Sequence, residues 1–417
     1  MAKNKNRNLV IGIIAILIFL AGINFLKNKL GERLLNKGIQ DLEQKEYTSA
    51  LENLRKSVWL NRRPAVAYLN LGKAYYYSGN LANALEELEL SLLRDSMIAE
   101  SYYFRGLVYM KMNDYNKSLE NLTRSIQTDS VYAEAYYQRG IARAHQGDLT
   151  GAIQDYKKSL IIDGKNLDAY YKSIESRAAL NDYIGAIDDY DKIIEADPGN
   201  AEALYQRGFF KINLGDNEGA INDFSNAILN NDSLFDAIYQ RGLCYARLKD
   251  NKNAVKDFTS CIRQHYNTGE MYYSRAVSYL KMNSTALAKD DIQKAISLGK
   301  DNPKYYNLAG IIMAYLQNYR GSLEYFGDAV KLDSKYSEAY FHRGVSWAIL
   351  KNHSKAVEDF SRCIAIDSTN AEAYLNRGIA NINLGYRANG CNDFNKANSL
   401  GYQGADAYVT MYCTELK

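Results

Sequence analysis

The small and apolar positions of the chain recur with a period of 34 residues from Gly31 to Gly404. This stretch divides, without an insertion or deletion, into eleven blocks that begin at residues 31, 65, 99, 133, 167, 201, 235, 269, 303, 337 and 371. We number the positions within each block from 1 to 34. A fixed period of this length indicates a repeat array, in which each block is one supersecondary unit.

Two positions in each block are small and a third is large. Position 8 is glycine in nine blocks, with Ile174 and Ala276 as the exceptions, and position 20 is alanine, serine or glycine in all of them. Position 24 carries a large side chain: Leu54, Leu88, Leu122, Tyr156, Tyr190, Phe224, Phe258, Ile292, Phe326, Phe360 and Phe394. Two antiparallel helices approach closely only where side chains are small. The pattern therefore predicts a helical hairpin that crosses at positions 8 and 20, with position 24 filling the space one turn further on.

Positions 15 and 16 mark the turn between the two predicted helices. Position 15 often holds glycine or asparagine, which adopt the left-handed conformation that ends a helix. Position 16 supplies candidate N-caps for the second helix: Asn80, Asp114, Asp148, Asp182, Asp216, Asp250, Ser284, Asn318 and Asn352. The three prolines, Pro64, Pro198 and Pro303, fall at block boundaries, where a helix must stop or start.

An apolar segment precedes the repeats. Residues Leu9 to Leu26 carry no charge, and at about 1.5 Å per residue they span roughly 27 Å as a helix, enough to cross the hydrocarbon core of a bilayer. A cleaved signal peptide has a similar basic start, but no small-x-small cleavage site follows, because Phe19 or Leu20 stands at the upstream position. We expect an uncleaved anchor in preference to a cleaved signal or a buried helix of a soluble protein.

The orientation of this anchor is less strongly indicated. Three basic residues precede the apolar segment and four follow it within a few turns, so the positive-inside rule does not separate the two orientations. An eight-residue leading tail usually stays in the cytoplasm. We expect a single-pass membrane protein with its repeats in the periplasm, and a cytoplasmic location of the repeats is the alternative.

The block from Ala133 to Asn166, AEAYYQRGIARAHQGDLTGAIQDYKKSLIIDGKN, closely resembles the tetratricopeptide repeat, and the resemblance covers about nine tenths of the chain. It implies an all-α fold, namely a right-handed α-solenoid superhelix of eleven helical hairpins over residues 31–404. A C-terminal capping helix over 405–417 is expected to follow, and a short basic tail with one transmembrane helix in 1–30 to precede. The resemblance also implies that the first helices line a concave groove, which in this family holds other proteins.

In this family, positions 2, 5, 6, 9, 12 and 13 of the first helix face the groove. Position 5 is tyrosine in six successive blocks, and position 6 is glutamine in three of them. The candidate partner-binding residues are therefore Tyr103, Tyr137, Tyr171, Tyr205, Tyr239, Tyr273, Gln138, Gln206 and Gln240. A tyrosine ladder can stack on an extended peptide and hydrogen-bond its backbone. The alternative is that these tyrosines are part of the family consensus and stabilise the hairpins.

Arginine at position 7 departs from the apolar residue that is usual in this family. Seven blocks carry it, and six of these have aspartate at position 23 of the same block. We interpret these residues as structural ion pairs that link the two helices of a block or neighbouring blocks. The block that begins at Pro303 has Ala309 and Tyr325 in their place, and we expect it to mark a bend or a specific docking site.

Five cysteines and four histidines show neither C-x-x-C nor H-x-x-x-H spacing, so no metal site is predicted. Cys261 and Cys363 occupy position 27, where a small core residue is usual. Residues Gly390 to Cys413 resemble the closing segment of some bacterial tetratricopeptide repeat proteins, in which a cysteine of the final helix faces one in the last repeat. The resemblance implies a disulfide between Cys391 and Cys413 and an oxidising compartment, and two buried thiols are the alternative.

Charge and motif content argue against nucleic-acid binding and catalysis. The net charge is +3, but five cations fall in the first thirty residues, and the remainder has 46 basic against 48 acidic residues. The chain contains no phosphate-binding loop, nucleophile elbow or zinc-protease motif, and no block is interrupted by a long loop. We expect no enzyme activity, no cofactor, no nucleic-acid partner and no small-molecule substrate.

Three hypotheses for the function remain. The preferred one is a membrane-tethered scaffold or adaptor that binds partner polypeptides in the groove, within an envelope assembly or secretion complex. The second is a chaperone-like holder of unfolded client proteins, for which the tyrosine ladder would be the contact surface. The third is a passive structural spacer.

Overall fold

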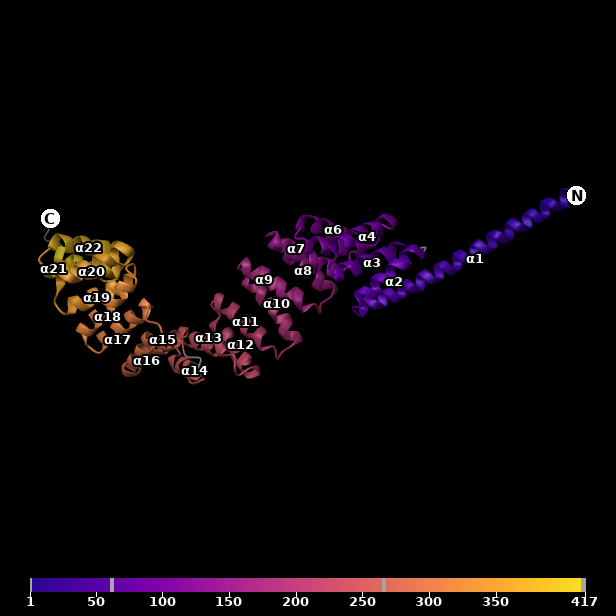
Figure 1. Cartoon of the computed structure of the whole chain (residues 1–417). Coiled ribbons are helices and arrows are strands. Elements are labelled where there is room, and N and C mark those ends of the chain that lie inside the picture. The colour runs from indigo at the N-terminus through magenta and orange to yellow at the C-terminus, as the bar shows by residue number, and fades with distance from the viewer. Residues whose placement is uncertain (1, 61–63, 265–267, 414–417) are drawn as a thin grey trace. The chain divides into compact units, whose positions relative to one another are not determined.

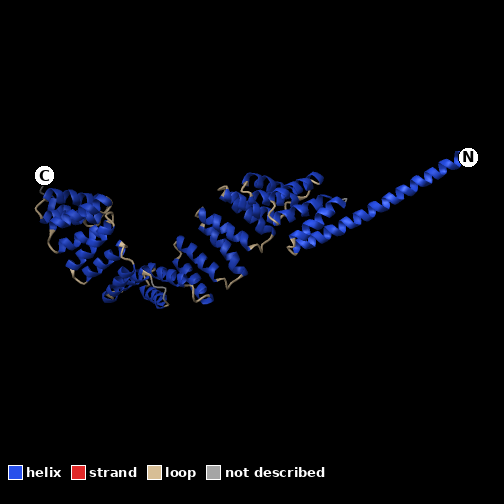
Figure 2. Cartoon of the chain, in the orientation of Figure 1, coloured by secondary structure: helices blue, strands red, loops and turns tan. Residues whose placement is uncertain are grey.

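The computed structural model describes residues 2–60, 64–264 and 268–413, and these residues form helices joined by short turns (Figure 2). Over this part of the chain there are 23 helices and no strand, which confirms the all-α prediction. The chain divides into two compact units, Met1–Pro198 and Gly199–Lys417 (Figure 1).

The first unit contains α1 (Ala2–Glu43), α2 (Tyr47–Leu60), α3 (Pro64–Tyr77), α4 (Leu81–Arg94), α5 (Ala99–Lys111), α6 (Tyr115–Thr128), α7 (Ala133–His145), α8 (Leu149–Ile162), α9 (Leu167–Ala179) and α10 (Tyr183–Ala196). The second unit contains α11 (Ala201–Asn213), α12 (Asn217–Asn230), α13 (Phe235–Arg247), α14 (Asn251–Arg263), α15 (Gly269–Lys281), α16 (Thr285–Leu298), α17 (Pro303–Tyr315), α18 (Tyr319–Leu332), α19 (Ser337–Ile349), α20 (His353–Ile366), α21 (Ala371–Asn383), α22 (Arg387–Ser399) and α23 (Ala405–Cys413). Consecutive helices from α1 to α22 form eleven hairpins, one for each 34-residue block. Within a unit, the second helix of a hairpin packs on the first helix of the next, and successive first helices such as α5 and α7 also touch.

The turn inside each hairpin has the same backbone conformation in every repeat. The residue at position 15 has a positive φ in all eleven: Lys45, Gly79, Asn113, Gly147, Asn181, Gly215, Lys249, Asn283, Gln317, Lys351 and Gly385. The next residue then caps the second helix, as where the Asp148 carboxylate accepts a hydrogen bond from the Gly151 N–H at 2.9 Å. Eight of the nine predicted caps make such a bond, whereas Ser284 stands at the N-cap without one.

The two helices of a hairpin meet where position 8 lies against position 24. A Cβ atom added to Gly140 would lie 2.5 Å from Cε1 of Tyr156, and one added to Gly208 would lie 2.8 Å from Cε1 of Phe224. Both rings are fully buried. Glycine is therefore required at these positions because the ring occupies the space that a side chain would need.

In the early hairpins the end of the second helix is bound to the start of the first helix of the same hairpin. In the first three hairpins a serine hydroxyl at position 27 donates to the carbonyl oxygen at position 1: Ser57 to Gly31 at 2.9 Å, Ser91 to Ala65 at 2.8 Å and Ser125 to Ala99 at 2.9 Å. The connections between hairpins of the first unit therefore share one edge, and the turns inside the hairpins share the opposite edge.

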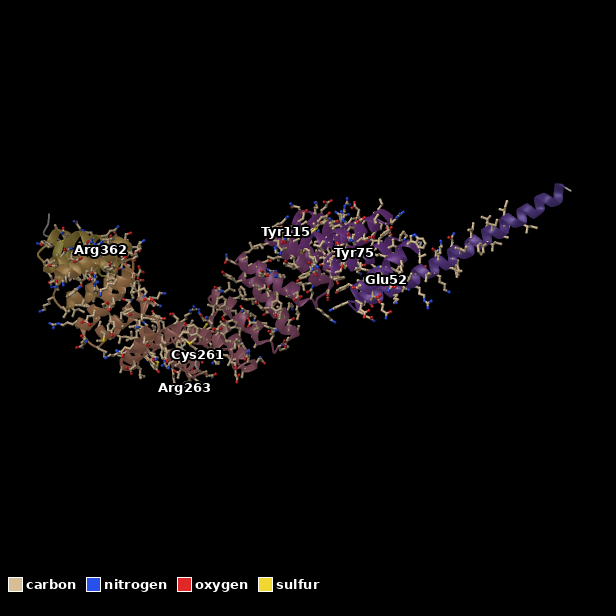
Figure 3. All side chains as sticks on the ribbon, in the orientation of Figure 1. Glu52, Tyr75, Tyr115, Cys261, Arg263 and Arg362 are labelled. Atoms are coloured by element: carbon tan, nitrogen blue, oxygen red, sulfur yellow. A yellow bond between two sulfur atoms is a disulfide. The ribbon has the colours of Figure 1, made fainter. Side chains whose placement is uncertain are left out.

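Helix α1 differs from the other first helices in its length. It runs without a break from Ala2 to Glu43, through the predicted boundary between anchor and repeats at residues 30 and 31, and Figure 1 shows its first part beyond the hairpins. The stretch Ile11–Glu43 is long and apolar enough to cross a membrane, and its most apolar 18-residue window has a mean hydropathy of 2.0 and is not buried. The side chains of residues 11–26 project from the ribbon with no other element beside them (Figure 3), whereas the part of α1 after Gly31 packs on α2.

The last hairpin is covered by the short helix α23, which begins at Ala405, the first residue of the predicted capping segment. Residues 414–417 of that segment lie outside the described residues. Tyr408 packs on Phe394 with 5.3 Å between ring centroids, and Cys391 and Cys413 form a disulfide with an S–S distance of 2.05 Å. The helix thus closes the apolar end of the array.

We expect Gly140→Val to lower the free energy of unfolding by about 1–3 kcal/mol, because the added side chain overlaps the buried ring of Tyr156. Urea denaturation followed by circular dichroism would measure this. Gly164→Ala is the matched control, since the nearest atom to its added Cβ is the Leu160 carbonyl oxygen at 3.6 Å. Equal transition midpoints for the two variants would contradict the role assigned to position 8.

Candidate partner-binding face

The tyrosines predicted at position 5 lie on the first helices, and the rings of Tyr137, Tyr205 and Tyr239 lean on the aromatic ring at position 24 of their own hairpin. The centroids of Tyr137 and Tyr156 are 6.1 Å apart, and those of Tyr239 and Phe258 are 5.7 Å apart. The Tyr239 hydroxyl also lies 3.3 Å from Oγ of Ser274, in the next hairpin. These rings therefore help to hold the hairpins together, as the consensus interpretation predicts.

The six tyrosines differ in how much of the ring remains available. Tyr171 is exposed, with 39% of its surface accessible, whereas the other five are partly buried. Burial raises the pKa of the Tyr137 and Tyr205 hydroxyls, and the carboxylates of Asp168 and Asp236 raise them further. These phenols are therefore neutral at pH 7 and able to donate a hydrogen bond.

The glutamines predicted at position 6 are half-buried on the same helices. The Nε2 of Gln206 donates to Oε1 of Glu202, its neighbour at position 2, at 2.7 Å. Glu100, at position 2 of the third hairpin, accepts a hydrogen bond from Nζ of Lys73 in the second hairpin at 2.7 Å. The position-2 glutamates Glu202 and Glu100 are therefore engaged in local hydrogen bonds.

A pocket of about 240 Å³ opens on the face formed by the first helices α7 and α9. It is lined by Ile141, Ala144, His145, Leu149, Tyr156, Lys172, Glu175, Ser176 and Ala179. All but Leu149, Tyr156 and Ser176 occupy positions 6, 9, 12 or 13 of the fourth and fifth repeats, the positions expected to face the groove. The pocket is smaller than the roughly 300–1,000 Å³ of typical small-molecule sites and has the size of one amino-acid side chain.

The floor of this pocket contains a buried hydroxyl. The Tyr156 side chain is fully buried, and its hydroxyl oxygen has no hydrogen-bond partner among the described residues. The nearby Ser176 hydroxyl donates to the Lys172 carbonyl oxygen at 3.0 Å, and it offers Tyr156 an acceptor only outside ordinary hydrogen-bond geometry. A buried hydroxyl without a well-formed bond is unfavourable by about 1–3 kcal/mol, so a polar group that entered the pocket and bonded to Tyr156 would be favoured.

Charged and aromatic side chains form the rim. Nζ of Lys172 lies 2.7 Å from Oε2 of Glu175, and the His145 ring stacks on Tyr115 with 4.7 Å between centroids. The rim is thus polar while Ile141 and Leu149 make the wall apolar. Sequence reasoning missed this pocket because Tyr156 lies on a second helix. The sequence did contain one signal for it. Position 24 is Leu, Ile or Phe in nine blocks and carries a hydroxyl group only at Tyr156 and Tyr190.

The arginines at position 7 make the ion pairs expected from the sequence. In six repeats the guanidinium forms a two-pronged contact with the aspartate at position 23: Arg139 with Asp155, Arg207 with Asp223, Arg241 with Asp257, Arg275 with Asp291, Arg343 with Asp359 and Arg377 with Asp393. The aspartate side chains are less than 10% exposed. These pairs are more deeply buried than surface salt bridges. Removal of either partner would leave the other as a buried charge without compensation, which is strongly destabilising.

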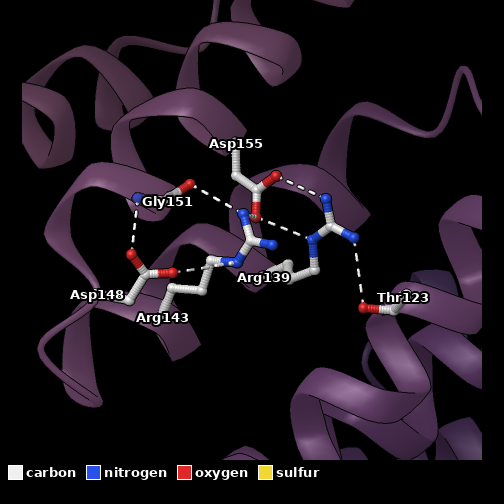
Figure 4. Close-up of polar contacts among 6 residues, drawn as sticks. All are labelled: Thr123, Arg139, Arg143, Asp148, Gly151 and Asp155. Carbon is white, nitrogen blue, oxygen red and sulfur yellow. Dashed lines mark hydrogen bonds and ion pairs between the residues drawn. The ribbon is translucent and has the colours of Figure 1, made fainter.

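The same arginines also reach the preceding repeat. Figure 4 shows Arg139 bound to Asp155 on one side and, through Nη1, to Oγ1 of Thr123 on α6 at 3.3 Å. A second guanidinium, that of Arg143, lies 3.0 Å from Oδ2 of Asp155 and also bonds to the Gly151 carbonyl oxygen. Equivalent contacts join Arg241 to Ser225, Arg275 to Thr259 and Arg377 to Ser361. The expectation of links within and between blocks is confirmed, and the partner at position 25 was not foreseen.

The hairpin formed by α17 and α18 replaces the ion pair with an apolar cluster. Ala309, Leu308 and Ile312 are buried together with Tyr305. The neighbouring Asn307 is 7% exposed, its Nδ2 donates to the Tyr336 hydroxyl at 3.3 Å, and its Oδ1 has no partner among the described residues. The departure noticed in the sequence is thus a change from electrostatic to apolar packing.

No group of three or more His, Cys, Asp or Glu side chains in the described ranges is arranged to hold a metal ion. The thiols of Cys244, Cys261 and Cys363 are buried. Burial raises the pKa of Cys244 to about 11 and that of Cys261 to about 12, so both remain protonated at neutral pH. Such thiols are packing residues and lack the exposure of a reactive cysteine.

The hairpin array defines a helical repeat solenoid, and sequence comparison identifies its family. Profiles described as tetratricopeptide repeat match residues 65–96, 103–167, 189–222, 236–267, 269–302 and 309–371. These segments make up more than half of the 417 residues, and the chain belongs to the tetratricopeptide repeat family. No curated protein matches the sequence. Folds of this family bind other proteins or peptides and are generally not enzymes, so the architecture is that of a protein–protein interaction scaffold.

Solved structures of similar architecture include the Cut9–Hcn1 hetero-tetramer of the APC/C, which is 13% identical, covers 95% of this chain and 99% of that chain, and has a TM-score of 0.47. Yeast Tom70 is 14% identical over 92% of this chain and 94% of that chain, with a TM-score of 0.43. A tetratricopeptide repeat protein from Parabacteroides merdae is 20% identical over 60% of this chain and 98% of that chain, with a TM-score of 0.38.

We expect Arg241→Met to destabilise the second unit by about 3–5 kcal/mol, because Asp257 would be left buried without its partner. Arg241→Met combined with Asp257→Leu should recover most of this loss, since no buried charge then remains. Thermal and urea unfolding would measure both. Lys192→Met is the control, because the Lys192–Glu195 pair is exposed and its removal should leave unfolding unchanged. A single variant as stable as the double variant would show that the pair is not coupled.

Proposed function

We propose that the protein is a membrane-tethered scaffold that binds partner polypeptides along the face of its first helices. The observation that carries the proposal is the pocket between α7 and α9, with the unpaired hydroxyl of Tyr156 at its floor. Its volume suits one side chain of a bound chain, and its polar rim suits a side chain with a hydrogen-bonding tip.

The tyrosines and glutamines at positions 5 and 6 are proposed to contact the same bound segment. Tyr171 is the most available of them, since it is exposed on α9 beside Lys172 of the pocket. The partly buried rings would offer only an edge or a hydroxyl. We therefore assign the main contact in the first unit to Tyr171 and the pocket, with Tyr137 in a supporting role.

The membrane tether is proposed from the exposed apolar part of α1. The compartment is proposed from the other end of the chain, where Cys391 and Cys413 are joined in a disulfide. Such bonds persist in oxidising compartments and are rare in the cytosol. Both observations support repeats that face outward in a cell envelope, where partners would belong to an assembly or secretion complex.

We expect a photo-crosslinking phenylalanine analogue in place of Tyr171 to capture one or a few partners in intact cells, because that side chain is open to solvent and the next residue, Lys172, lines the pocket. Mass spectrometry of the crosslinked bands would identify them. The matched control carries the analogue in place of Gln127, which is exposed on the second helix α6.

Capture of many unrelated proteins from position 171 would favour a chaperone-like holder over an adaptor. The same bands from both positions, or none from position 171, would contradict partner binding on the first-helix face. Tyr156→Phe keeps the shape of the pocket and removes only the hydroxyl, so it should weaken capture without unfolding the repeat.

Thiol trapping tests the compartment. Cells quenched in acid, denatured and treated with a mass-tagged maleimide should yield three modified cysteines, since Cys391 and Cys413 are joined and Cys244, Cys261 and Cys363 are free thiols. Cys391→Ser should raise the number to four by releasing Cys413. Five modified cysteines in the unaltered chain would place the C-terminal end in a reducing compartment and overturn the outward orientation.

A further inference from the structure

One edge of the first unit holds the connections between its hairpins. The apolar part of α1 leaves the unit at this same edge. Gly31, at position 1, accepts a hydrogen bond from Ser57 near the end of α2, and Ala65 accepts the equivalent bond from Ser91 near the end of α4. Helix α1 continues from Gly31 back towards its apolar segment without a break. The apolar segment therefore leaves the first unit from this edge, which Figure 1 shows as the side of the hairpins where α1 stands alone.

Three large apolar side chains project into solvent at this edge. Trp59, near the end of α2, is 78% exposed, Leu93, near the end of α4, is 77% exposed, and Met97, in the following connection, is 74% exposed. We call these three residues the loop-edge cluster. Each is more exposed than the exposed large apolar residues of the α1 segment, where the largest value is 68%. Such exposure of large apolar side chains is unfavourable in water.

The apolar character of these positions is strongest in the repeats that come first in the sequence. Position 29 holds Trp59 in the first repeat, Leu93 in the second and Ile161 in the fourth, and position 33 holds Met97 in the second and Val131 in the third. In the later repeats these positions are mostly polar: Arg263, Ser297 and Lys331 at position 29, and Asp301, Lys335 and Thr369 at position 33. Leu229, which is 82% exposed, is the exception. The apolar residues of this edge are concentrated in the repeats nearest to α1.

The depth of Trp59 relative to the apolar segment is set by direct contacts. The segment ends at Leu26, and Nζ of the next residue, Lys27, lies 5.6 Å from the centroid of the Trp59 ring. Gly31, which binds the end of α2, is only five residues after Leu26, or about 7.5 Å along the helix. Tryptophan and lysine are the residues that favour the boundary between hydrocarbon and water. Trp59 thus stands at the level where that boundary would lie.

We propose that the loop-edge cluster rests on the surface of the same bilayer that α1 crosses, with the Trp59 ring in the interfacial layer. This inference rests on the proposed membrane tether. The lipid surface is favoured over a protein partner because the cluster is continuous with the end of the apolar segment through the contact between Lys27 and Trp59. Arg94, exposed beside Leu93, would meet lipid phosphate groups. The helices of the first unit would then point away from the membrane surface, and the face formed by its first helices would remain accessible to partners.

The chain contains two tryptophans, Trp59 and Trp347, so fluorescence can report the position of one residue. The full chain with Trp347→Phe would be reconstituted into vesicles of phosphatidylcholine and phosphatidylglycerol, with or without bromine near the top of the acyl chains. We expect brominated lipid to remove about half of the Trp59 emission, because an interfacial ring lies within contact of those carbons. Aqueous iodide should quench it little.

The matched control moves the reporter to the opposite edge of the first unit. Ser78→Trp, in a chain that also carries Trp59→Phe and Trp347→Phe, places tryptophan at the exposed turn between α3 and α4. This turn is about one helix length, roughly 20 Å, from the loop-edge cluster. Its emission should respond to iodide and not to brominated lipid. Equal quenching of Trp59 and of this control by iodide would overturn the proposal.

A third reporter separates this proposal from the tether itself. Ile16→Trp, in the chain without Trp59 and Trp347, lies within the apolar segment of α1. If brominated lipid quenches it while Trp59 stays open to iodide, the tether stands and the surface contact is wrong. If brominated lipid leaves it unchanged, α1 does not enter the bilayer, and both the tether and the surface contact are wrong. Quenching of both by brominated lipid supports the two together.

Discussion

The close approach of two helices at positions 8 and 24 is the constraint on which the rest of the array depends. Because Gly140 lets the Tyr156 ring lie against the backbone, positions 7 and 23, one residue before each, are brought face to face. That is where Arg139 and Asp155 meet in a two-pronged contact. The remaining Nη1 of the arginine is then directed at Thr123 in the preceding hairpin. One steric rule inside a hairpin thus also determines a polar link between hairpins.

This arrangement explains why charged residues are tolerated in the seam of a helical repeat. The Asp223 side chain is fully buried, yet Arg207 supplies two hydrogen bonds to it and Lys211 lies 2.8 Å from its second oxygen. A buried carboxylate satisfied in this way contributes specificity of register, since a shift of one residue would leave it unpaired. Where the arginine and aspartate are absent, as around Ala309, apolar side chains fill the same seam.

The hairpins and their ends were predictable because each rests on a local rule that recurs every 34 residues. Some turn residues were not predictable by type: Lys45 and Gln317 adopt the left-handed conformation that glycine favours. Their place at position 15 of the repeat, rather than their own backbone preference, imposes this conformation. Ser284 shows the converse, since its type suits an N-cap but its side chain makes no capping bond.

The candidate site was predictable only in part. The family resemblance identified the helix face, but the sequence could not show that Tyr137 and Tyr239 lean on rings of the second helix and are therefore partly buried. The pocket was missed for a related reason. It combines residues of two repeats with Tyr156 from a second helix, and such a combination follows from packing distances that no spacing rule contains.

The unbroken course of α1 gives the first hairpin a fixed direction. A flexible linker defines only how far a domain can reach, whereas a continuous helix carries angle as well as distance. Because no turn separates residues 2–30 from Glu43, any rotation of the apolar part about an axis across the helix appears undiminished where α2 packs. The tilt of the apolar part of α1 therefore sets the orientation of the first hairpin, because both belong to one continuous helix.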